Sequence, residues 1–198
     1  MILEDSRYTA LKKHIEKYCL LQEGEWAYIA SKWKPRDYGK GEYILKAGQV
    51  ENYFYFVHRG VMRLFADKDD QEVNAGFTYN GDFSGVYDSF LAQQPADLYL
   101  QAIAPCECLR IHYDDMMELY DAYKSMERFG RLFHADMLLL MARRQIEARS
   151  YSAEERFQRL LDHSPHIFQL VPQKYLASYL GMTPETFSRL RKKLTPRS

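Results

Sequence analysis

The end of the chain, residues 173–198, contains two short helical patterns separated by a tight turn. The first pattern runs into Gly181, a residue that suits a left-handed backbone because it has no side chain to clash. The second begins after Thr183, a favourable N-cap, with Pro184 in the first helical position, where no backbone donor is needed. This arrangement predicts a helix-turn-helix, whose second helix enters the major groove of DNA.

The second helix of this motif has an apolar side and a polar side. Its inward residues are Phe187, Leu190 and Leu194, and its outward residues are Glu185, Ser188, Arg189 and Lys192. A glutamate accepts from the cytosine amino group and an arginine donates two hydrogen bonds to guanine, which predicts base contacts at Glu185, Ser188 and Arg189. Phosphate contacts, which position the protein without specifying sequence, are predicted for Thr183, Arg191, Lys192 and Lys193. A helical hairpin without this role is the alternative.

The charge of the chain is divided unevenly between its two ends. The whole chain has 27 Lys and Arg and 27 Asp and Glu, so its net charge is zero. From Arg156 onward, eight Lys and Arg stand against two Asp and Glu, so the end is +6 and residues 1–155 are −6. A basic end on an acidic body suggests an anionic partner, although a solvated lysine-rich terminus gives the same count.

Composition limits the class of protein. The 198 residues, 46% of them apolar, suffice for one large or two small globular domains. Cys19, Cys106 and Cys108 are an odd number without paired spacing, which argues against a disulfide scaffold and against a thiolate metal site. Cys106 and Cys108 are expected on one face of a strand. With no long apolar segment or signal peptide and an acidic start, we expect a cytoplasmic protein that does not enter a membrane.

Short strand patterns occupy the middle of the chain, between two helical regions. The strand-like stretches are 43–45, 53–58, 61–65, 72–79, 98–104 and 107–112. Short strands with turn residues at regular spacing predict a barrel or a sandwich. Helical spacing precedes them over residues 6–33 and follows them from residue 114 to about residue 150.

The second helical region is apolar on nearly all sides around residues 137–141. A helix of this kind must be covered all round, and one barrel covers one face. A second copy of the helix across a two-fold axis would cover the other, which predicts a homodimer. We place Phe129, Phe133, Met137 and Leu140 on this dimer helix. A single buried helix in a monomer is the alternative.

These features together resemble the Crp/Fnr superfamily of bacterial transcription regulators over nearly the whole chain. The resemblance lies in residues 40–49 and 55–60 of the barrel and in the tail Leu-Gly-Met-Thr-Pro-Glu-Thr-Phe-Ser-Arg at residues 180–189. It implies an α+β fold: N-terminal helices, an antiparallel double-stranded β-helix (a jelly-roll-like barrel), a long dimerisation helix and a winged-helix-like helix-turn-helix. The implied domains are a cyclic-nucleotide-binding-like sensor at 1–118, the dimerisation helix at 119–150 and the DNA-binding domain at 151–198. In the family, the matching glutamate and arginine read bases.

The chain departs from the family where the cyclic-nucleotide branch holds its phosphate. That branch uses a Gly-Glu pair and, further on, an arginine. In this chain Gly85 keeps the glycine, Val86 stands at the glutamate position, and the arginine position falls near Ala96. Tyr87 and Asp97 follow Val86 and Ala96 in the sequence. A buried phosphate needs a cation, and this degenerate effector pocket offers none. We therefore expect no tight binding of cyclic AMP, an effector of unknown identity and no cofactor.

Other branches of the family are also poorly matched. An iron–sulfur branch needs several N-terminal cysteines, and Cys19 is alone in that region. A heme branch needs an axial ligand, and His58 and His112 are candidates that are more often structural. Because the chain ends soon after the recognition helix, a wing hairpin would have to precede it, at residues 163–172.

These inferences predict a homodimeric, sequence-specific DNA-binding transcription regulator on a palindromic site, with no enzymatic activity. Its expected partners are double-stranded DNA, a second copy of itself and RNA polymerase. One alternative is a regulator with a vestigial pocket that acts without an effector. A cupin-type metal enzyme is another, but it requires clustered histidine and carboxylate ligands. A cyclic-nucleotide module that regulates a partner protein is the third, and the recognition helix argues against it.

Overall fold

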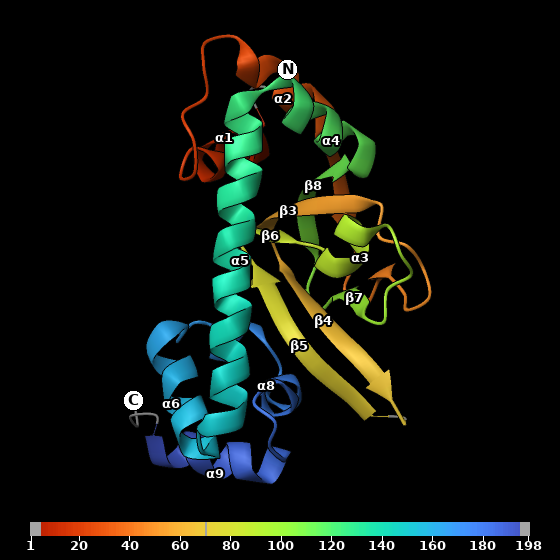
Figure 1. Cartoon of the computed structure of the whole chain (residues 1–198). Helices are drawn as coiled ribbons and strands as arrows, with labels where there is room; N and C mark the ends of the chain where they lie inside the picture. The colour runs from red at the N-terminus through yellow and green to blue at the C-terminus, as the bar shows by residue number, and fades with distance from the viewer. Residues whose placement is uncertain (1–4, 70, 195–198) are drawn as a thin grey trace. The chain divides into compact units, whose positions relative to one another are not determined.

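The computed structural model describes residues 5–69 and 71–194, and Figure 1 labels its helices and strands. In chain order they are α1 Ser6–Ile15, α2 Glu25–Lys32, β1 Lys34–Tyr38, β2 Tyr43–Leu45, β3 Tyr53–Arg59, β4 Val61–Lys68, β5 Gln71–Tyr79, β6 Asp82–Ser84, α3 Tyr87–Ala92, β7 Tyr99–Ala102, β8 Cys106–His112, α4 Tyr113–Ala122, α5 Lys124–Ser150, α6 Ala153–His163, α7 Ile167–Leu170, α8 Gln173–Tyr179 and α9 Pro184–Leu194.

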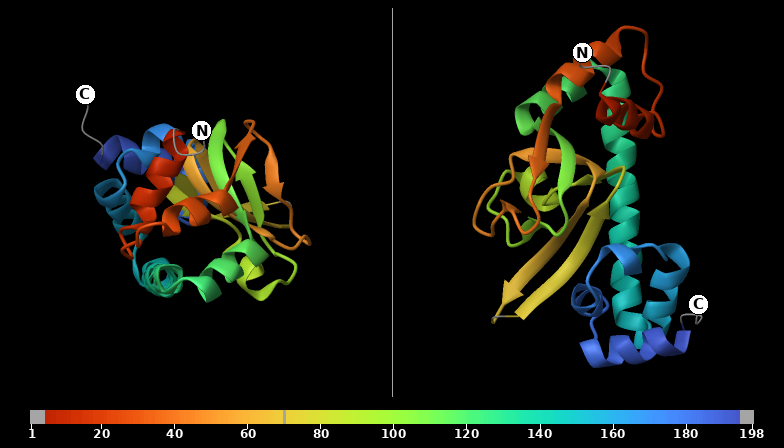
Figure 2. Two further views of the ribbon diagram at one scale, coloured as in Figure 1. Left: turned by 90° about the horizontal axis from the view of Figure 1, so that it is seen from above. Right: turned by 180° about the vertical axis from the view of Figure 1, so that it is seen from behind.

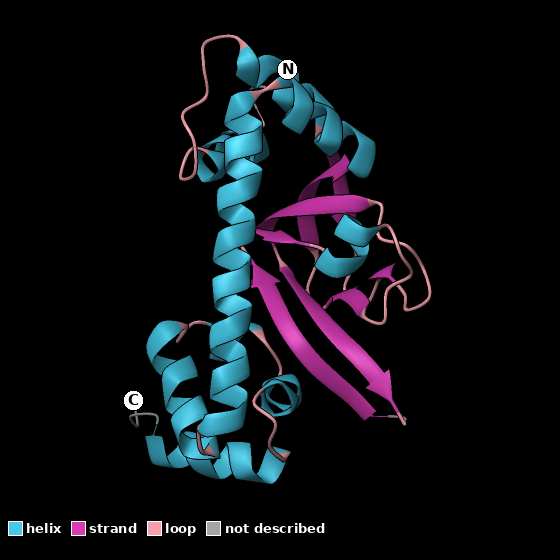
Figure 3. Ribbon diagram, viewed as in Figure 1, coloured by secondary structure: helices cyan, strands magenta, loops and turns pink. Residues whose placement is uncertain are grey.

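The strands form two four-stranded sheets, in the orders β1-β8-β3-β6 and β2-β7-β4-β5 (Figure 3). The pairs β1–β8, β3–β8, β3–β6 and β2–β7 are antiparallel. Phe56 of β3 lies opposite Phe83 of β6. Successive side chains of a strand point to opposite faces, yet Phe54, Tyr55, Phe56 and Val57 are all buried, so both faces of β3 are covered. The predicted α+β fold with an antiparallel barrel is confirmed.

The first core fills the space between the two sheets. Its buried members are Tyr38, Leu45, Tyr55, Val57, Met62, Val86, Ala96, Leu100, Ala102, Cys106 and Cys108. They come from strands of both sheets, together with residues just before α3 and β7. Cys106 and Cys108 share one face of β8, as predicted, and both are free thiols.

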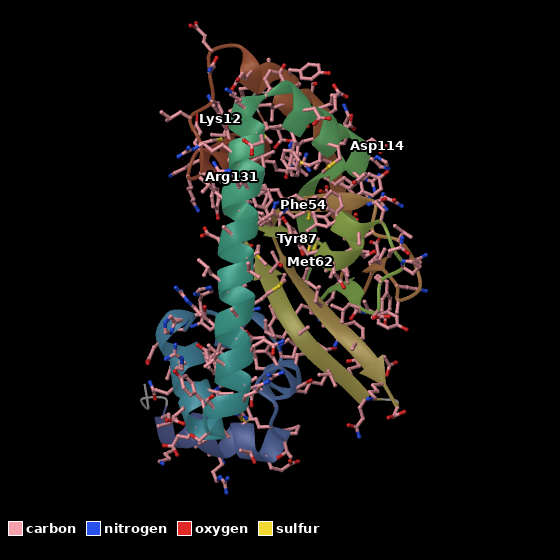
Figure 4. The ribbon with its side chains drawn as sticks, in the orientation of Figure 1. Lys12, Phe54, Met62, Tyr87, Asp114 and Arg131 are labelled. Atoms are coloured by element: carbon pink, nitrogen blue, oxygen red, sulfur yellow. The ribbon has the colours of Figure 1, made fainter. Side chains whose placement is uncertain are left out.

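A second core of aromatic rings lies between β3, β6 and the first half of α5. Phe54 and Phe83 stack with their centroids 4.9 Å apart, and Phe83 meets Phe133 edge-on at 5.3 Å. Tyr87 joins them, with its ring 5.6 Å from that of Phe54 (Figure 4). Phe129 and Phe133 are therefore almost fully buried inside the chain. Both residues lie on the helix predicted for them, on the side of α5 that packs against its own sheet.

The chain divides into two compact units. The first comprises residues up to Leu64 together with Phe77–Asp136, and the second comprises Phe65–Gly76 together with the described residues from Met137 onward. α5 thus contributes its first half to one unit and its second half to the other. The predicted domain boundaries after residues 118 and 150 instead give this helix a domain of its own.

The second unit is mainly helical. Figures 1 and 2 show α6, α8 and α9 gathered around the end of α5. The Phe157 ring of α6 lies at the centre, with its centroid 5.2 Å from that of Phe168 and 5.2 Å from that of Phe187. The wing hairpin predicted at residues 163–172 is not formed. That stretch contains α7, because Ile167 and the neighbouring Phe168 turn toward the helical core instead of alternating along a strand.

Several elements were not expected from the sequence. β1 is polar, with all its residues except Tyr38 exposed, because it is an edge strand of the first sheet. An edge also tolerates Pro35, which cannot donate to a ladder. β6 and α3 are short, and the long helical region is interrupted at Tyr123, where the backbone is extended between α4 and α5.

Among the described residues, no helix is long and apolar enough to cross a membrane.

Candidate nucleic-acid interface

The turn between α8 and α9 is built by local backbone hydrogen bonds. The Gly181 N–H donates to the Ser178 carbonyl at 3.0 Å, and the Met182 N–H donates to the Ala177 carbonyl at 3.0 Å. These two bonds close the end of α8 as a Schellman motif, which needs a left-handed residue. Gly181 supplies it with φ of +63°, as the sequence predicted.

Thr183 caps the start of α9. Its hydroxyl oxygen accepts the Thr186 N–H at 3.3 Å, and its carbonyl accepts the Phe187 N–H at 3.0 Å. The backbone N–H of Glu185 and the Thr183 hydroxyl lower the pKa of the Glu185 carboxyl. Glu185 is therefore an ionised acceptor at neutral pH. On the inward side of α9, Phe187 and Leu190 are buried, as expected.

The outward side of α9 forms a shallow depression lined by Pro184, Glu185, Ser188, Arg189 and Lys192. All three residues predicted to contact bases lie in it. Of the residues predicted to contact phosphates, Lys192 lines the depression, whereas Thr183 serves as the cap and Arg191 is half-buried beside it. One helix face therefore presents a carboxylate, a hydroxyl and two cations.

Lys193, also predicted to contact phosphate, is paired within the chain. Its ammonium lies 2.7 Å from Glu154 Oε1 in α6, and both side chains are largely exposed. The sequence did not suggest this pair, because Glu154 lies on another helix, 39 residues earlier.

Two contacts that support α8 were also missed from the sequence. Arg156 of α6 donates from Nε to the Leu180 carbonyl at 2.9 Å and from Nη1 to the Tyr151 carbonyl. Ser178 of α8 is held by the β4–β5 hairpin: its hydroxyl accepts the Asn74 N–H at 3.0 Å and donates to the Glu72 carbonyl at 2.9 Å. Helical spacing within 173–180 shows the buried face of α8 but not these partners.

The residues of the predicted effector pocket are mostly used for packing. Val86 and Ala96 are 0% and 3% exposed and belong to the barrel core. Gly85 is buried, Tyr87 packs in the aromatic core, and Asp97 is exposed. Burial raises the pKa of the Tyr87 hydroxyl. The position of these five residues, here called the cassette, is thus filled largely by apolar side chains and offers no cation.

The second half of α5 leaves apolar side chains in solvent. Leu138 and Leu139 are 69% and 54% exposed, and Met141 and Ile146 are also exposed. Of the residues predicted for the dimer helix, Met137 is half-buried and Leu140 is 40% exposed. The exposed apolar surface thus lies further along α5 than Phe129 and Phe133.

The histidines considered as ligands have structural contacts. His58 Nε2 lies 3.3 Å from the Ser6 hydroxyl, and His112 Nδ1 accepts the Asp114 N–H at the start of α4. Across residues 5–69 and 71–194, no three His, Cys, Asp or Glu side chains form a group that could hold a metal ion.

The fold matches that of known regulators. Residues 35–123 match the family model of the cyclic nucleotide-binding domain. FixK2 from Bradyrhizobium japonicum is similar with a TM-score of 0.71 and 19% identity, over 82% of this chain and 84% of that one. The chain has the Crp/Fnr fold. In this fold, the barrel is the cyclic nucleotide-binding domain and the C-terminal helices form the helix-turn-helix.

Two further solved structures share the Crp/Fnr fold with this chain. The c-di-GMP-responsive global regulator CLP from Xanthomonas campestris has a TM-score of 0.65 and 21% identity, over 87% of this chain and 91% of that one. A Crp/Fnr-family transcriptional regulator from Eubacterium rectale has a TM-score of 0.66 and 12% identity, over 87% and 83%. No curated protein sequence gave a significant match to the chain.

Proposed function

We propose that this chain is a homodimeric, sequence-specific DNA-binding regulator of transcription, acting in the cytoplasm with RNA polymerase as a partner. The observation that carries the proposal is the outward face of α9, where Glu185, Ser188 and Arg189 surround one depression. The Crp/Fnr fold supports the same function. The proposed function requires no catalytic activity.

In this proposal α9 enters the major groove and its first turns meet the bases. Arg189 donates two hydrogen bonds to a guanine, Glu185 accepts from a cytosine amino group, and Ser188 contacts a neighbouring base. Lys192, Arg191 and the Thr183 end of the helix contact phosphates. Lys193 must exchange Glu154 for phosphate, and this costs little because an exposed ion pair contributes about 0–1 kcal/mol.

Replacement of Arg189 by alanine is expected to weaken binding to the specific site by about 1–3 kcal/mol, or roughly fivefold to 150-fold in Kd. The site is first defined by selecting bound sequences from a random DNA pool. Fluorescence anisotropy at one salt concentration then gives Kd for the selected and for random DNA. Lys193→Ala is the control, which should weaken both DNAs alike and lower the salt slope by about one. Equal losses for Arg189→Ala on the two DNAs would show that this residue does not read a base.

The dimer in this proposal forms through the second half of α5. Leu138, Leu139 and Ile146 lie on one side of the helix and are exposed. A second copy across a two-fold axis would cover this side and set two recognition helices about 34 Å apart on a palindromic site.

Leu139→Glu is expected to raise the dimer dissociation constant at least about tenfold, because an unpaired carboxylate is costly in an apolar interface. Sedimentation velocity over a range of concentrations measures it. Leu20→Glu makes the same chemical change at a side chain that is 88% exposed outside α5, and should leave the constant unchanged. A monomeric wild type, or equal effects of the two substitutions, would exclude this interface.

The buried Val86 and Ala96 favour a cassette that no longer takes a cyclic phosphate. CLP responds to c-di-GMP by its description, but this chain offers no cation at the cassette to hold such a phosphate. The alternative proposal is therefore a regulator that binds DNA without an effector. In either form, a ligand can bias the recognition helices only by its different affinity for two arrangements of the chain.

A further inference from the structure

A polar cleft of about 410 Å³ lies in the first unit, among β1, β2, β3 and β8. Its volume is within the range of small-molecule sites. None of the five residues of the cassette lines it. The cleft is therefore separate from the position at which the cyclic-nucleotide branch holds its phosphate.

Arg110 of β8 contributes a guanidinium group to this cleft. Because side chains alternate along a strand, Arg110 shares the inner face of β8 with Cys106 and Cys108 of the barrel core. Its guanidinium carbon lies 4.0 Å from the centre of the Tyr53 ring. Burial raises the pKa of Tyr38, and the charge of Arg110 offsets part of this effect. Both tyrosines line the cleft, so the guanidinium lies between two of its walls.

The N–H donors of Arg110 are not used within the chain. Its side chain is half-buried, yet it has no hydrogen bond and no carboxylate within ion-pair distance in residues 5–69 and 71–194. Stacking on Tyr53 engages the face of the planar group and leaves the donors along its edge available. Arg36, the other arginine of the cleft, is already paired, 3.6 Å from Glu42. Arg110 therefore points to an anion supplied from outside the chain.

The buried carboxyl group of Glu51 limits the charge that this anion can have. It accepts the Tyr53 N–H at 3.1 Å and the Tyr55 hydroxyl at 3.3 Å. Burial raises its pKa to about 7, and these bonds, one from the Val86 backbone and the charge of Arg110 offset burial only in part. Glu51 is thus ionised in only a part of the molecules near pH 7 and compensates Arg110 incompletely. A ligand with one negative charge fits this balance better than a dianion, which the ionised form of Glu51 repels more strongly.

Gln49 and Asn52 add two side-chain amides to the same cleft. Gln49 Oε1 accepts the Lys46 N–H at 2.9 Å, and Asn52 Nδ2 donates to the Val50 carbonyl at 3.3 Å. The amino group of Gln49 and the side-chain oxygen of Asn52 have no partner in the part of the chain that the structure describes. A free donor and a free acceptor suit hydroxyl groups, which both accept and donate.

We propose that this cleft binds a small hydroxy acid, with its carboxylate on the Arg110 guanidinium and its hydroxyl groups on Gln49 and Asn52. A carboxylate matches the planar donor edge of arginine through two parallel hydrogen bonds. If the chain is the regulator proposed above, the hydroxy acid is its effector. The binding itself does not depend on that function.

The test is calorimetric titration of the full chain, without DNA, with lactate, glycerate, gluconate and glucuronate. At least one of these acids is expected to bind in a 1:1 ratio per chain. Its carboxamide, which removes the negative charge, should bind at least about tenfold more weakly. Arg110→Met, which keeps an apolar contact with Tyr53 but removes the donors, should cause a similar loss. Inorganic phosphate is the competing anion and should bind more weakly than the acid.

The matched control is Arg59→Met, which removes the same charge from an exposed side chain of the same sheet, 3.9 Å from Glu107, and should bind as the wild type does. Absence of an isotherm with every one of these acids overturns the proposal. Undiminished binding of the carboxamide or by Arg110→Met, or tighter binding of phosphate, also overturns it. If circular dichroism shows that Arg110→Met does not fold, the carboxamide and phosphate titrations decide. Because no DNA is present, failure of hydroxy-acid binding and failure of DNA binding are observed separately.

Discussion

Phe157→Ala is expected to lower the free energy of unfolding of the second unit by about 3–5 kcal/mol. Phe157 is 0% exposed, and its ring lies 5.2 Å from both Phe168 and Phe187. The substitution leaves a cavity between α6, α7 and α9, and the small unit has few other large buried side chains with which to fill it. Urea unfolding monitored by circular dichroism measures the loss.

Because Phe187 lies on the inward side of α9, the same substitution should also weaken specific DNA binding. Leu170→Ala in α7 is the control: its side chain is 39% exposed, and a change within about 0.5 kcal/mol is expected. An unfolding free energy for Phe157→Ala within 1 kcal/mol of the wild type would mean that the aromatic cluster does not hold the helices of this unit together.

Gly60→Ala is expected to lower the free energy of unfolding of the first unit by about 2–5 kcal/mol. Gly60 joins β3 to β4 with φ of +106°, a conformation that costs about 1–2 kcal/mol for alanine. A Cβ there would also lie 2.4 Å from the Pro105 carbonyl oxygen and 2.6 Å from Cys106 Sγ. Relief of that clash requires movement of backbone, which adds about 1–3 kcal/mol.

Gly41→Ala separates these two causes. Gly41 has a similar φ of +87°, but a Cβ there would meet no atom within 4 Å. Its substitution should therefore cost only the conformational strain, about 1–2 kcal/mol. Thermal and urea unfolding of both variants provide the comparison, and equal losses would show that the approach of β4 to residues 105–106 is not a tight contact.

The local parts of this molecule could be predicted from its sequence. Gly181 and Thr183 act through hydrogen bonds that span only a few residues, so the turn and the start of α9 follow from residue order. The outward set Glu185, Ser188 and Arg189 follows from helical periodicity, and these residues share one depression. All six strand-like stretches also overlap strands by more than half of their length, because alternation is a local pattern.

Predictions that depended on contacts between segments distant in the sequence were less successful. Phe129, Phe133, Met137 and Leu140 were placed on one long helix, but an apolar helix does not indicate which of its faces its own barrel covers, and the structure buries the two phenylalanines against it. Residues 163–172 were predicted to form a wing because the family's hairpin would have to precede the recognition helix, and the structure has the short helix α7 in that stretch. Contacts of Arg156 with Leu180, and of Ser178 with Asn74, join segments more than 20 residues apart and leave no mark in local spacing.

The sequence by itself determined the turn and caps of the helix-turn-helix, a set of short strands for a barrel or a sandwich, and the lack of a cation at the cassette, because caps, alternation and residue type are properties of neighbouring positions. Only the tertiary structure decided which side of α5 remains exposed, and that Lys193 of α9 pairs with Glu154 of α6. The physical reason is that burial and pairing of a side chain depend on segments distant in sequence, and only packing brings these segments together.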